Sequence, residues 1–168
     1  MAPEEAFDQY HQAVYSFAYR LTRNPDAAED VTQECFLALV RAPERYDTSR
    51  GSLKTYLFAM ARNLALKHYR DNPAEEPLDD FAPAAADDLE DAVLSSAVAA
   101  AVAALPLLQR EASVLFEYEG ATLEEIARVV EAEVGTVKSR LHRARERLRR
   151  SLAPYRKDVN SYGTVRER

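Results

Sequence analysis

Cysteine, histidine and glycine are all scarce in this sequence of 168 residues. The single cysteine, Cys35, excludes an internal disulfide framework and any multi-cysteine zinc site. The three histidines are scattered, and no predicted helix places two of them at metal-ligand spacing. The four glycines form no phosphate-binding loop pattern. We therefore expect no metal, no cofactor and no enzymatic activity, and we interpret Cys35 as a small buried apolar residue.

Long apolar runs are also absent. The most apolar stretch, "AVLSSAVAAAVAALPLL" at 92–108, is shorter than the roughly 20 residues that a bilayer-spanning helix needs, and it contains a serine pair and a proline. We interpret this stretch as a buried helix with no membrane insertion. The first ten residues are acidic and lack the apolar core of a secretory signal. A lone unpaired cysteine fits a reducing compartment, so the expected location is the cytoplasm.

Basic residues are nearly missing from the middle of the chain. The whole sequence has 22 basic and 28 acidic residues, for a net charge of -6. Residues 71–120 contain one base, Arg110, against twelve acids, whereas residues 121–168 contain twelve bases and seven acids. The densest basic stretch is "VGTVKSRLHRARERLRR" at 134–150, whose only acid is Glu146. The overall charge therefore conceals an acidic middle and a basic end.

Helical periodicity dominates the sequence and predicts an all-α fold. The first helix has one apolar stripe with steps of three and four residues: Phe7, Tyr10, Val14, Phe17 and Leu21. "NPDAAED" then separates it from a second helix that runs to about Val40, with Asp26 as the expected N-cap. A third amphipathic helix is expected at about 52–70. Three such helices with short links predict a first helical domain at 1–70.

A second small helical domain is predicted at 92–155. The preceding stretch, 71–91, is acidic and proline-rich and has no base, which is typical of a flexible linker. Helices are expected at 92–105 and from Pro106 to Tyr118. A capping box at Thr122 and Glu125 opens a short helix that ends near Val130, and the basic helix follows. Residues 156–168 form a polar tail.

A short helix followed by a basic helix is typical of a helix-turn-helix motif. Val137, Leu141, Ala144 and Leu148 form the apolar face of the basic helix. Its other face carries arginines that can bond guanine edges, and nearby bases and hydroxyls can bind phosphates. A solvated basic face is the alternative, but the capped helix before it favours DNA. The predicted contacts to duplex DNA are Thr136, Lys138, Ser139, Arg140, Arg143 and Arg147.

Two parts of the chain resemble one known family. "TLEEIARVVEAEVGTVKSRLHRARERLR" at 122–149 strongly resembles region 4 of bacterial RNA polymerase sigma factors of the extracytoplasmic-function group (group IV of the sigma-70 superfamily). "DAAEDVTQECF" at 26–36 is similar to the core-binding helix of region 2, and "GSLKTYLFAMARNLALKHYR" at 51–70 is similar to its promoter-melting segment. The resemblance covers about residues 5–150. It implies a protein that binds core RNA polymerase and directs promoter-specific transcription initiation.

The resemblance also implies a role for each domain. Region 4 would recognise the minus 35 promoter element as duplex, and region 2 would capture the minus 10 element as a single strand. A basic track, aromatic rings and amides suit single-strand capture. For Tyr46, half-buried packing is an equal alternative to a pocket for a flipped base. The expected minus 10 residues are Tyr46, Ser49, Arg50, Lys54, Arg62, Asn63 and Lys67.

Protein partners are implied in the same way. The polymerase clamp would contact one face of the second helix, formed by Asp30, Gln33, Glu34 and Leu37. Without the resemblance, these residues would be an ordinary solvated acidic face with one stray leucine. An anti-sigma factor is a further expected partner, and the free protein is expected to be a monomer. The acidic linker either mimics RNA in the polymerase channels or only tethers the domains.

Two alternatives and one departure accompany this interpretation. A sigma-like decoy could bind an anti-sigma factor without promoter activity. Such a decoy is expected to lose the exposed basic residues of the last helix, and this chain keeps them. A stand-alone helix-turn-helix repressor would act as a dimer, and the region 2 motifs argue against it.

The turn of the motif carries Glu131 where the family usually has glycine, so this residue must avoid or tolerate positive φ. The register of the base contacts depends on that turn.

Overall fold

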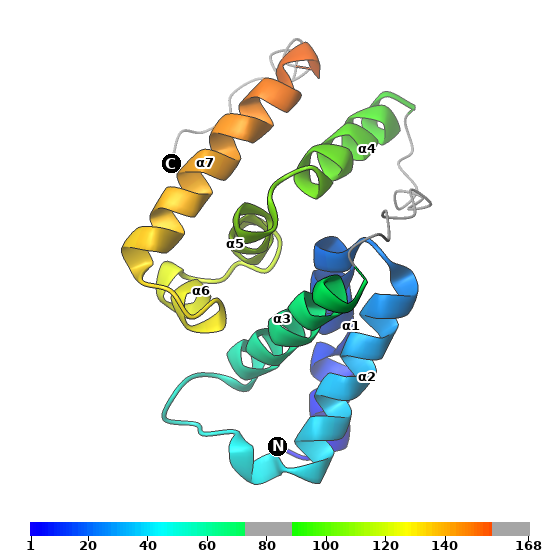
Figure 1. The fold of residues 1–168 in the computed structure, drawn as a ribbon. Helices are drawn as coiled ribbons and strands as arrows, with labels where there is room; N and C mark the ends of the chain where they lie inside the picture. Colours follow the sequence, from blue (N-terminus) through cyan, green and yellow to red (C-terminus); the bar gives the residue numbers. More distant parts are fainter. Residues whose placement is uncertain (73–88, 156–168) are drawn as a thin grey trace.

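The fold consists of α-helices joined by short turns, as the computed structural model shows for residues 1–72 and 89–155 (Figure 1). Over these residues there are seven α-helices, two short 3₁₀ helices and no strand. The all-α prediction is confirmed. In chain order the elements are α1 (Pro3–Thr22), α2 (Pro25–Arg41), η1 (Pro43–Arg45), α3 (Leu53–Asp71), α4 (Leu89–Ala103), α5 (Leu107–Glu117), α6 (Leu123–Val129), α7 (Val134–Ser151) and η2 (Ala153–Tyr155).

The first three α-helices pack around a shared apolar core. Phe17, Leu21 and Leu57 are fully buried there. The ring centroids of Phe17 and Phe58 are 5.1 Å apart, which joins α1 to α3. The predicted stripe of α1 is wrong at its first position, because Phe7 is 44% exposed. Phe7 lies in the second turn of α1, where its ring stacks on His11 and meets the Phe36 ring edge-on.

The break between α1 and α2 differs from the prediction by two residues. Arg23 adopts the left-handed conformation with φ of 56° and ends α1, while its amide donates to the carbonyl of Tyr19. The Asn24 side chain then accepts hydrogen bonds from the amides of Asp26 and Ala27. The N-cap is therefore Asn24, and the predicted Asp26 cap is wrong. Pro25 explains the difference, because proline favours the first helical position and places the cap directly before it.

Helices α4 to α7 form the second group. α3 extends to Asp71 and α4 begins at Leu89, so the helices reach into both ends of the predicted linker. The rest of that linker and the tail at 156–168 lie outside the described residues. Thr122 is the N-cap of α6, since its side chain accepts from the amide of Glu125. Leu115 and Ile126 are fully buried between the helices of this group.

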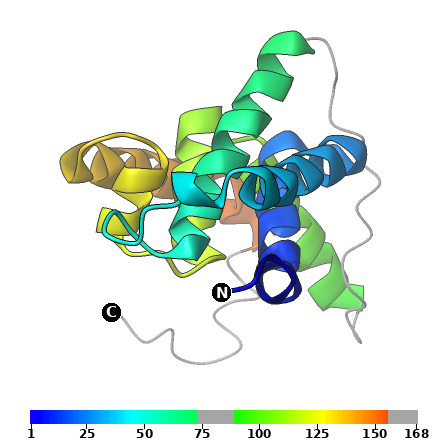
Figure 2. The ribbon, with the colours of Figure 1, turned by 90° about the horizontal axis from the view of Figure 1, so that it is seen from below.

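The two groups of helices pack against each other. α1 contacts α5 and α3 contacts α6, and Figure 2 shows α3 with α2 on one side and the yellow α6 on the other. Arg110, the lone base of the acidic middle, donates to the carbonyl of Leu21 at 2.7 Å and to the Tyr69 hydroxyl at 2.9 Å. Arg110 thereby satisfies a carbonyl at the end of α1, which has no partner within its own helix.

Cys35 lies inside the first domain with no exposed surface. Burial, with a smaller contribution from Glu34, raises the pKa of its thiol to about 12. The thiolate is the reactive form of cysteine, so Cys35 is a structural residue, as the sequence indicated.

We predict that Cys35 in the folded protein does not react with iodoacetamide at pH 8. The raised pKa keeps the thiol protonated, and burial blocks access, so alkylation requires unfolding. The measurement is intact mass after alkylation with and without urea. Thr48→Cys, at an exposed loop position, supplies the control and should react once in the native state. Two alkylated sites in native Thr48→Cys would contradict the prediction.

Candidate nucleic-acid interface

A tight turn joins α6 to α7 and sets the orientation of the basic helix. Glu131 in this turn has φ of 53°, so it occupies the left-handed region without being glycine. The amide of the next residue, Ala132, donates to the carbonyl of Ala127 and closes the end of α6. α7 begins at Val134. The chain therefore tolerates positive φ at Glu131, and the helix begins where the sequence predicted.

The outward face of α7 carries most of the predicted DNA contacts. Val137, Leu141 and Ala144 are buried and hold the helix against the rest of its domain. The Ser139 hydroxyl donates to the carbonyl of Gly135 at 3.1 Å, which leaves its oxygen free to accept. The exposed residues of the predicted set are Thr136, Lys138, Ser139, Arg143 and Arg147.

Arg140 is the exception and does not lie on this exposed face. Its side chain is only 20% exposed, and its Nη1 lies 3.9 Å from Oε1 of Glu111 in α5. The expectation that Arg140 lies on the exposed, DNA-facing side of the basic helix was wrong. Its spacing contained the signal: Arg140 is three residues after Val137 and four before Ala144, so it shares their side of the helix.

The loop before α3 holds three of the predicted minus 10 residues. Tyr46 is half-buried; its hydroxyl donates to the carbonyl of Gly51 at 3.2 Å, and its ring centroid is 5.3 Å from that of Tyr56. This is the arrangement that the packing alternative expects. Ser49 donates its hydroxyl and its amide to the Asp47 carboxylate, and these bonds lower the pKa of Asp47. Arg50 is exposed.

Helix α3 carries the other four predicted minus 10 residues. Asn63 and Lys67 are exposed. Lys54 is half-buried, with its ammonium 5.5 Å from the centre of the Phe58 ring. Arg62 is turned inward: its Nε lies 2.8 Å from Oε2 of Glu111, and its Nη2 lies 3.2 Å from Oε1. Since the Arg62 side chain is only 13% exposed, nucleic acid cannot reach its guanidinium in this arrangement.

The predicted polymerase-binding face is present on α2. Asp30, Gln33, Glu34 and Leu37 are all exposed, and Leu37 is 47% exposed. The sequence interpretation missed a largely apolar groove beside Leu37. Its apolar lining is Pro3, Phe7, Phe36, Leu37 and Val40, and Glu4, Asp8 and Gln33 also border it. The signal for Val40 was its spacing, because it follows Leu37 by three residues on α2. The structure thus places an apolar strip next to the acids.

The described part of the chain contains no group of three or more potential metal ligands. Nor does any of its helices have the length and apolar character needed to cross a membrane.

Comparison with known families assigns both halves of this arrangement. Residues 6–74 match the Sigma-70 region 2 family, and residues 95–148 match the Sigma-70 region 4 family. These matches cover α1–α3 and most of the second group of helices. The two matches therefore place the chain in the sigma-70 class.

Similar proteins of known family identify the group within the sigma-70 class to which the chain belongs. The ECF RNA polymerase sigma factor SigW of Bacillus subtilis is 32% identical over 161 residues, and the match covers 86% of each chain. The ECF RNA polymerase sigma factor SigE of Mycolicibacterium smegmatis is 34% identical over 90% of this chain, which spans 62% of the SigE length. The chain belongs to the ECF family of RNA polymerase sigma factors. These are non-enzymatic transcription initiation factors, so the expectation of no enzymatic activity is confirmed.

Solved structures give the same result for the fold. A sigma factor RpoE, solved in complex with the anti-sigma factor NepR from Bartonella quintana, is 26% identical, with a TM-score of 0.74 over 89% of this chain and 96% of that chain. CnrH, solved with the cytosolic domain of CnrY, is 24% identical, with a TM-score of 0.70 over 90% of this chain and 88% of that chain. The second likeness concerns the fold alone.

We predict that Glu131→Gly stabilises the protein by about 0.5–1 kcal/mol, because glycine adopts positive φ without the steric cost that a Cβ imposes. The measurement is the free energy of unfolding from urea titration. Glu131→Ala is the matched control: it removes the same carboxylate but keeps the Cβ, so it should not stabilise. Equal stabilisation by both variants would show that the carboxylate, rather than the backbone, is responsible.

Proposed function

We propose that this chain binds core RNA polymerase and directs it to promoters, with α7 recognising the minus 35 duplex and α3 with its preceding loop capturing the minus 10 single strand. The observation that carries the proposal is the division of α7 into a buried apolar face and an exposed face of hydroxyls and cations, directly after a short capped helix. Membership of the sigma factor family supplies the context for that motif.

The exposed face of α7 has the chemistry that duplex recognition requires. Guanidinium groups bond guanine edges bidentately, and lysine and hydroxyl groups neutralise or bond phosphates. Arg143 and Arg147 are one turn apart and both point to solvent, so they can enter a major groove together. Because Arg140 faces Glu111, the proposed base contacts in this arrangement fall on Arg143 and Arg147 rather than on Arg140.

Single-strand capture is proposed for Asn63, Lys67 and Arg50, with Tyr46, Ser49 and Lys54 nearby. An exposed amide can bond base edges, and exposed cations follow the phosphates. Tyr46 is held by its hydroxyl bond to Gly51, so in this role it would stack through the uncovered part of its ring.

Two protein partners are proposed. Core RNA polymerase would contact the acidic face of α2 together with Leu37, where the apolar groove adds surface that a partner can desolvate. An anti-sigma factor is the second, supported by the RpoE–NepR complex, whose sigma factor chain matches across both domains. Such a protein acts where RNA polymerase is, so we place it in the cytoplasm and propose a monomeric free form.

The experiment that tests the function is run-off transcription with the purified chain and core RNA polymerase on genomic fragments that include its own upstream region. Discrete transcripts that depend on the chain would establish the activity, and their start sites would define both promoter elements. Tight polymerase binding without transcripts from a complete fragment library would favour the decoy. A dimer with no polymerase affinity would favour the repressor.

We predict that Arg143→Ala weakens binding to a duplex carrying the mapped upstream element by ~1–3 kcal/mol, the usual loss for a bidentate base contact. Fluorescence anisotropy at fixed salt measures it. Arg149→Ala is the control, because Arg149 is equally cationic and exposed but pairs with Glu146 on another face of α7. Similar losses for both variants would indicate that α7 contributes charge without base recognition.

We predict that Asp30→Ala combined with Gln33→Ala lowers the affinity for core polymerase at least about fivefold and leaves the helical content unchanged, because both side chains are exposed. Surface plasmon resonance with immobilised core enzyme measures the affinity, and circular dichroism checks the fold. Glu124→Ala, an exposed acid of α6, removes the same net charge and should bind normally. Full affinity of the double variant would place the polymerase contact elsewhere.

A further inference from the structure

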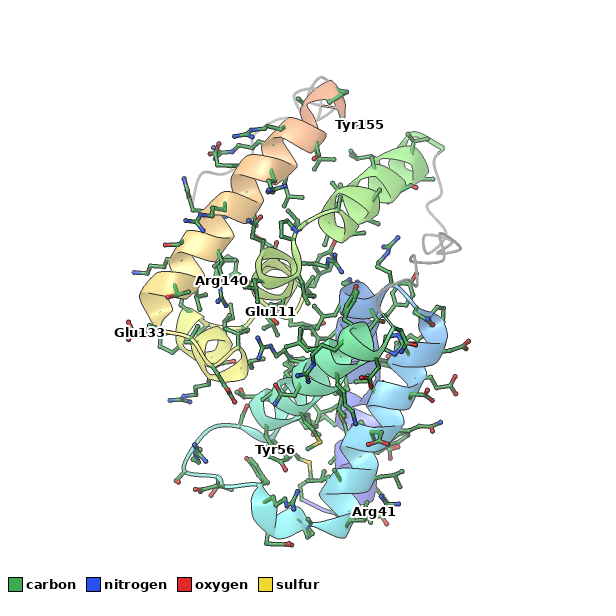
Figure 3. All side chains as sticks on the ribbon, in the orientation of Figure 1. Arg41, Tyr56, Glu111, Glu133, Arg140 and Tyr155 are labelled. Carbon is green, nitrogen blue, oxygen red and sulfur yellow. The ribbon has the colours of Figure 1, made fainter. Side chains whose placement is uncertain are left out.

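Glu111 of α5 has a fully buried carboxylate that faces two arginines from different parts of the molecule. Arg62 reaches it from α3 of the first domain and Arg140 from α7 of the second. Figure 3 shows Glu111 and Arg140 beside each other between α5 and α7. Both arginines belong to the set that the sequence assigned to promoter DNA. One acid therefore neutralises a cation from each expected DNA-binding surface.

The geometry makes Arg62 the main partner. Its guanidinium forms two hydrogen bonds with the carboxylate, at 2.8 and 3.2 Å, which is the fork arrangement that gives strong arginine–carboxylate pairs. Arg140 approaches no closer than 3.9 Å, and its buried Nη1 has no hydrogen-bond partner within the described residues. The strong pair thus crosses the boundary between the domains, and the weak one stays within the second domain.

Other contacts hold the same boundary closed. Arg110, next to Glu111 in sequence, bonds the carbonyl of Leu21 and the hydroxyl of Tyr69. Arg20 of α1 lies over the Tyr118 ring at 4.0 Å.

The loop proposed for single-strand capture also lies at this boundary. A Cβ placed on Gly51 would lie 3.6 Å from Nη1 of Arg128 in α6, so the loop lies close to the second domain. α3 itself contacts α6. Gly51 and Leu53 are half-buried at this boundary, whereas Arg50 and Ser52 are exposed.

A carboxylate pair of this kind suits a reversible contact. Burying both charges costs much of what their attraction returns, so the pair adds little net stability compared with two solvated ions. Removing one partner is costly, because the other charge is then left buried alone. A phosphate group offers Arg62 the same bidentate geometry as Glu111, so nucleic acid can replace the carboxylate on opening.

We propose that the Arg62–Glu111 pair is an intramolecular latch that keeps the free protein closed and withholds Arg62 from single-stranded DNA. This inference rests on the proposed function, in which α3 captures a single strand. Opening separates α3 from α5 and α6, exposes the loop at Gly51, and lets Arg62 exchange the carboxylate for the DNA backbone. Glu111 is a positioning residue in this scheme, since it acts only through Arg62.

The test combines a distance and an affinity, each measured on the full chain without polymerase. Nitroxide labels at Gln12→Cys and His142→Cys, both at exposed or half-exposed positions on α1 and α7, report the separation of the domains by double electron–electron resonance. Cys35 can stay in place because it is buried. Unlabelled protein is titrated into a fluorescein-labelled single-stranded DNA of mixed sequence, and anisotropy gives the affinity.

Glu111→Gln keeps the shape of the side chain and removes its charge, and Arg110→Gln breaks the neighbouring contact without touching Arg62. Both should lengthen the interdomain distance and raise the affinity for the single strand at least about fivefold. The two changes alter net charge in opposite directions, so a shared gain in affinity cannot arise from charge alone. Glu117→Gln, on the same helix but exposed, is the control and should change neither readout.

The latch would be overturned if both variants kept the interdomain distance of the wild type. It would also be overturned if they opened without a gain in affinity for single-stranded DNA. Circular dichroism establishes that each variant is folded. The wild type supplies a measurement that needs no substitution: saturating single-stranded DNA should lengthen its interdomain distance, and an unchanged distance in the bound state would also overturn the proposal. Because neither readout involves polymerase or a promoter, failure of the latch is distinguishable from failure in run-off transcription.

Discussion

The packing of this protein depends on one buried negative charge. An ionised carboxylate with no exposed surface is tolerated only where cations and hydrogen bonds compensate for its lost hydration. Glu111 obtains this compensation chiefly from Arg62, which is 49 residues away in sequence, and in part from Arg140. α5 must therefore place Glu111 within reach of both Arg62 on α3 and Arg140 on α7, which fits the packing of α1 against α5 and of α3 against α6.

The pairing of buried acids with cations also bears on how a chain of net negative charge can present a basic helix. Two acids of the middle segment, Glu111 and Glu119, face cations of the first domain. Burial raises the pKa of Glu119, which follows α5, and the nearby cations of Lys54 and Arg20 lower this pKa by a smaller amount. On the outer face of α7, Lys138, Arg143 and Arg147 are exposed to solvent. Arg62 and Glu111 thus pair at the boundary, whereas the cations of the face proposed for nucleic acid are exposed.

The two outward surfaces differ in chemistry in the way that the partners proposed for them require. The α2 face combines acids and an amide with Leu37 and a neighbouring apolar groove, a mixture suited to a protein partner. The α7 face has hydroxyls and guanidinium groups and no exposed large apolar residue, which suits a polyanion. The turn at Glu131 determines the composition of the α7 face, because its positive φ sets where α7 begins and hence which side chains face outward.

Much of this could be predicted from the sequence, because helices and their faces are local properties. A period of 3.6 residues identified the helices, the buried side of α7 and the exposed acids of α2, and the scarcity of cysteine and histidine removed metal and disulfide chemistry. Local patterns also contained two signals that went unused, namely Arg140 between Val137 and Ala144, and Pro25 immediately after the true cap.

The roles of Arg62, Arg110 and Glu111 were decided by tertiary structure alone. A guanidinium that looks available on an isolated amphipathic helix becomes a buried partner once another helix places a carboxylate against it. No local pattern specifies a pair separated by dozens of residues, because its energy depends on the dielectric and geometry that exist only after the domains pack. The sequence by itself determined the helices and the kind of partners they suit, and the packing decided which cations remain free to meet them.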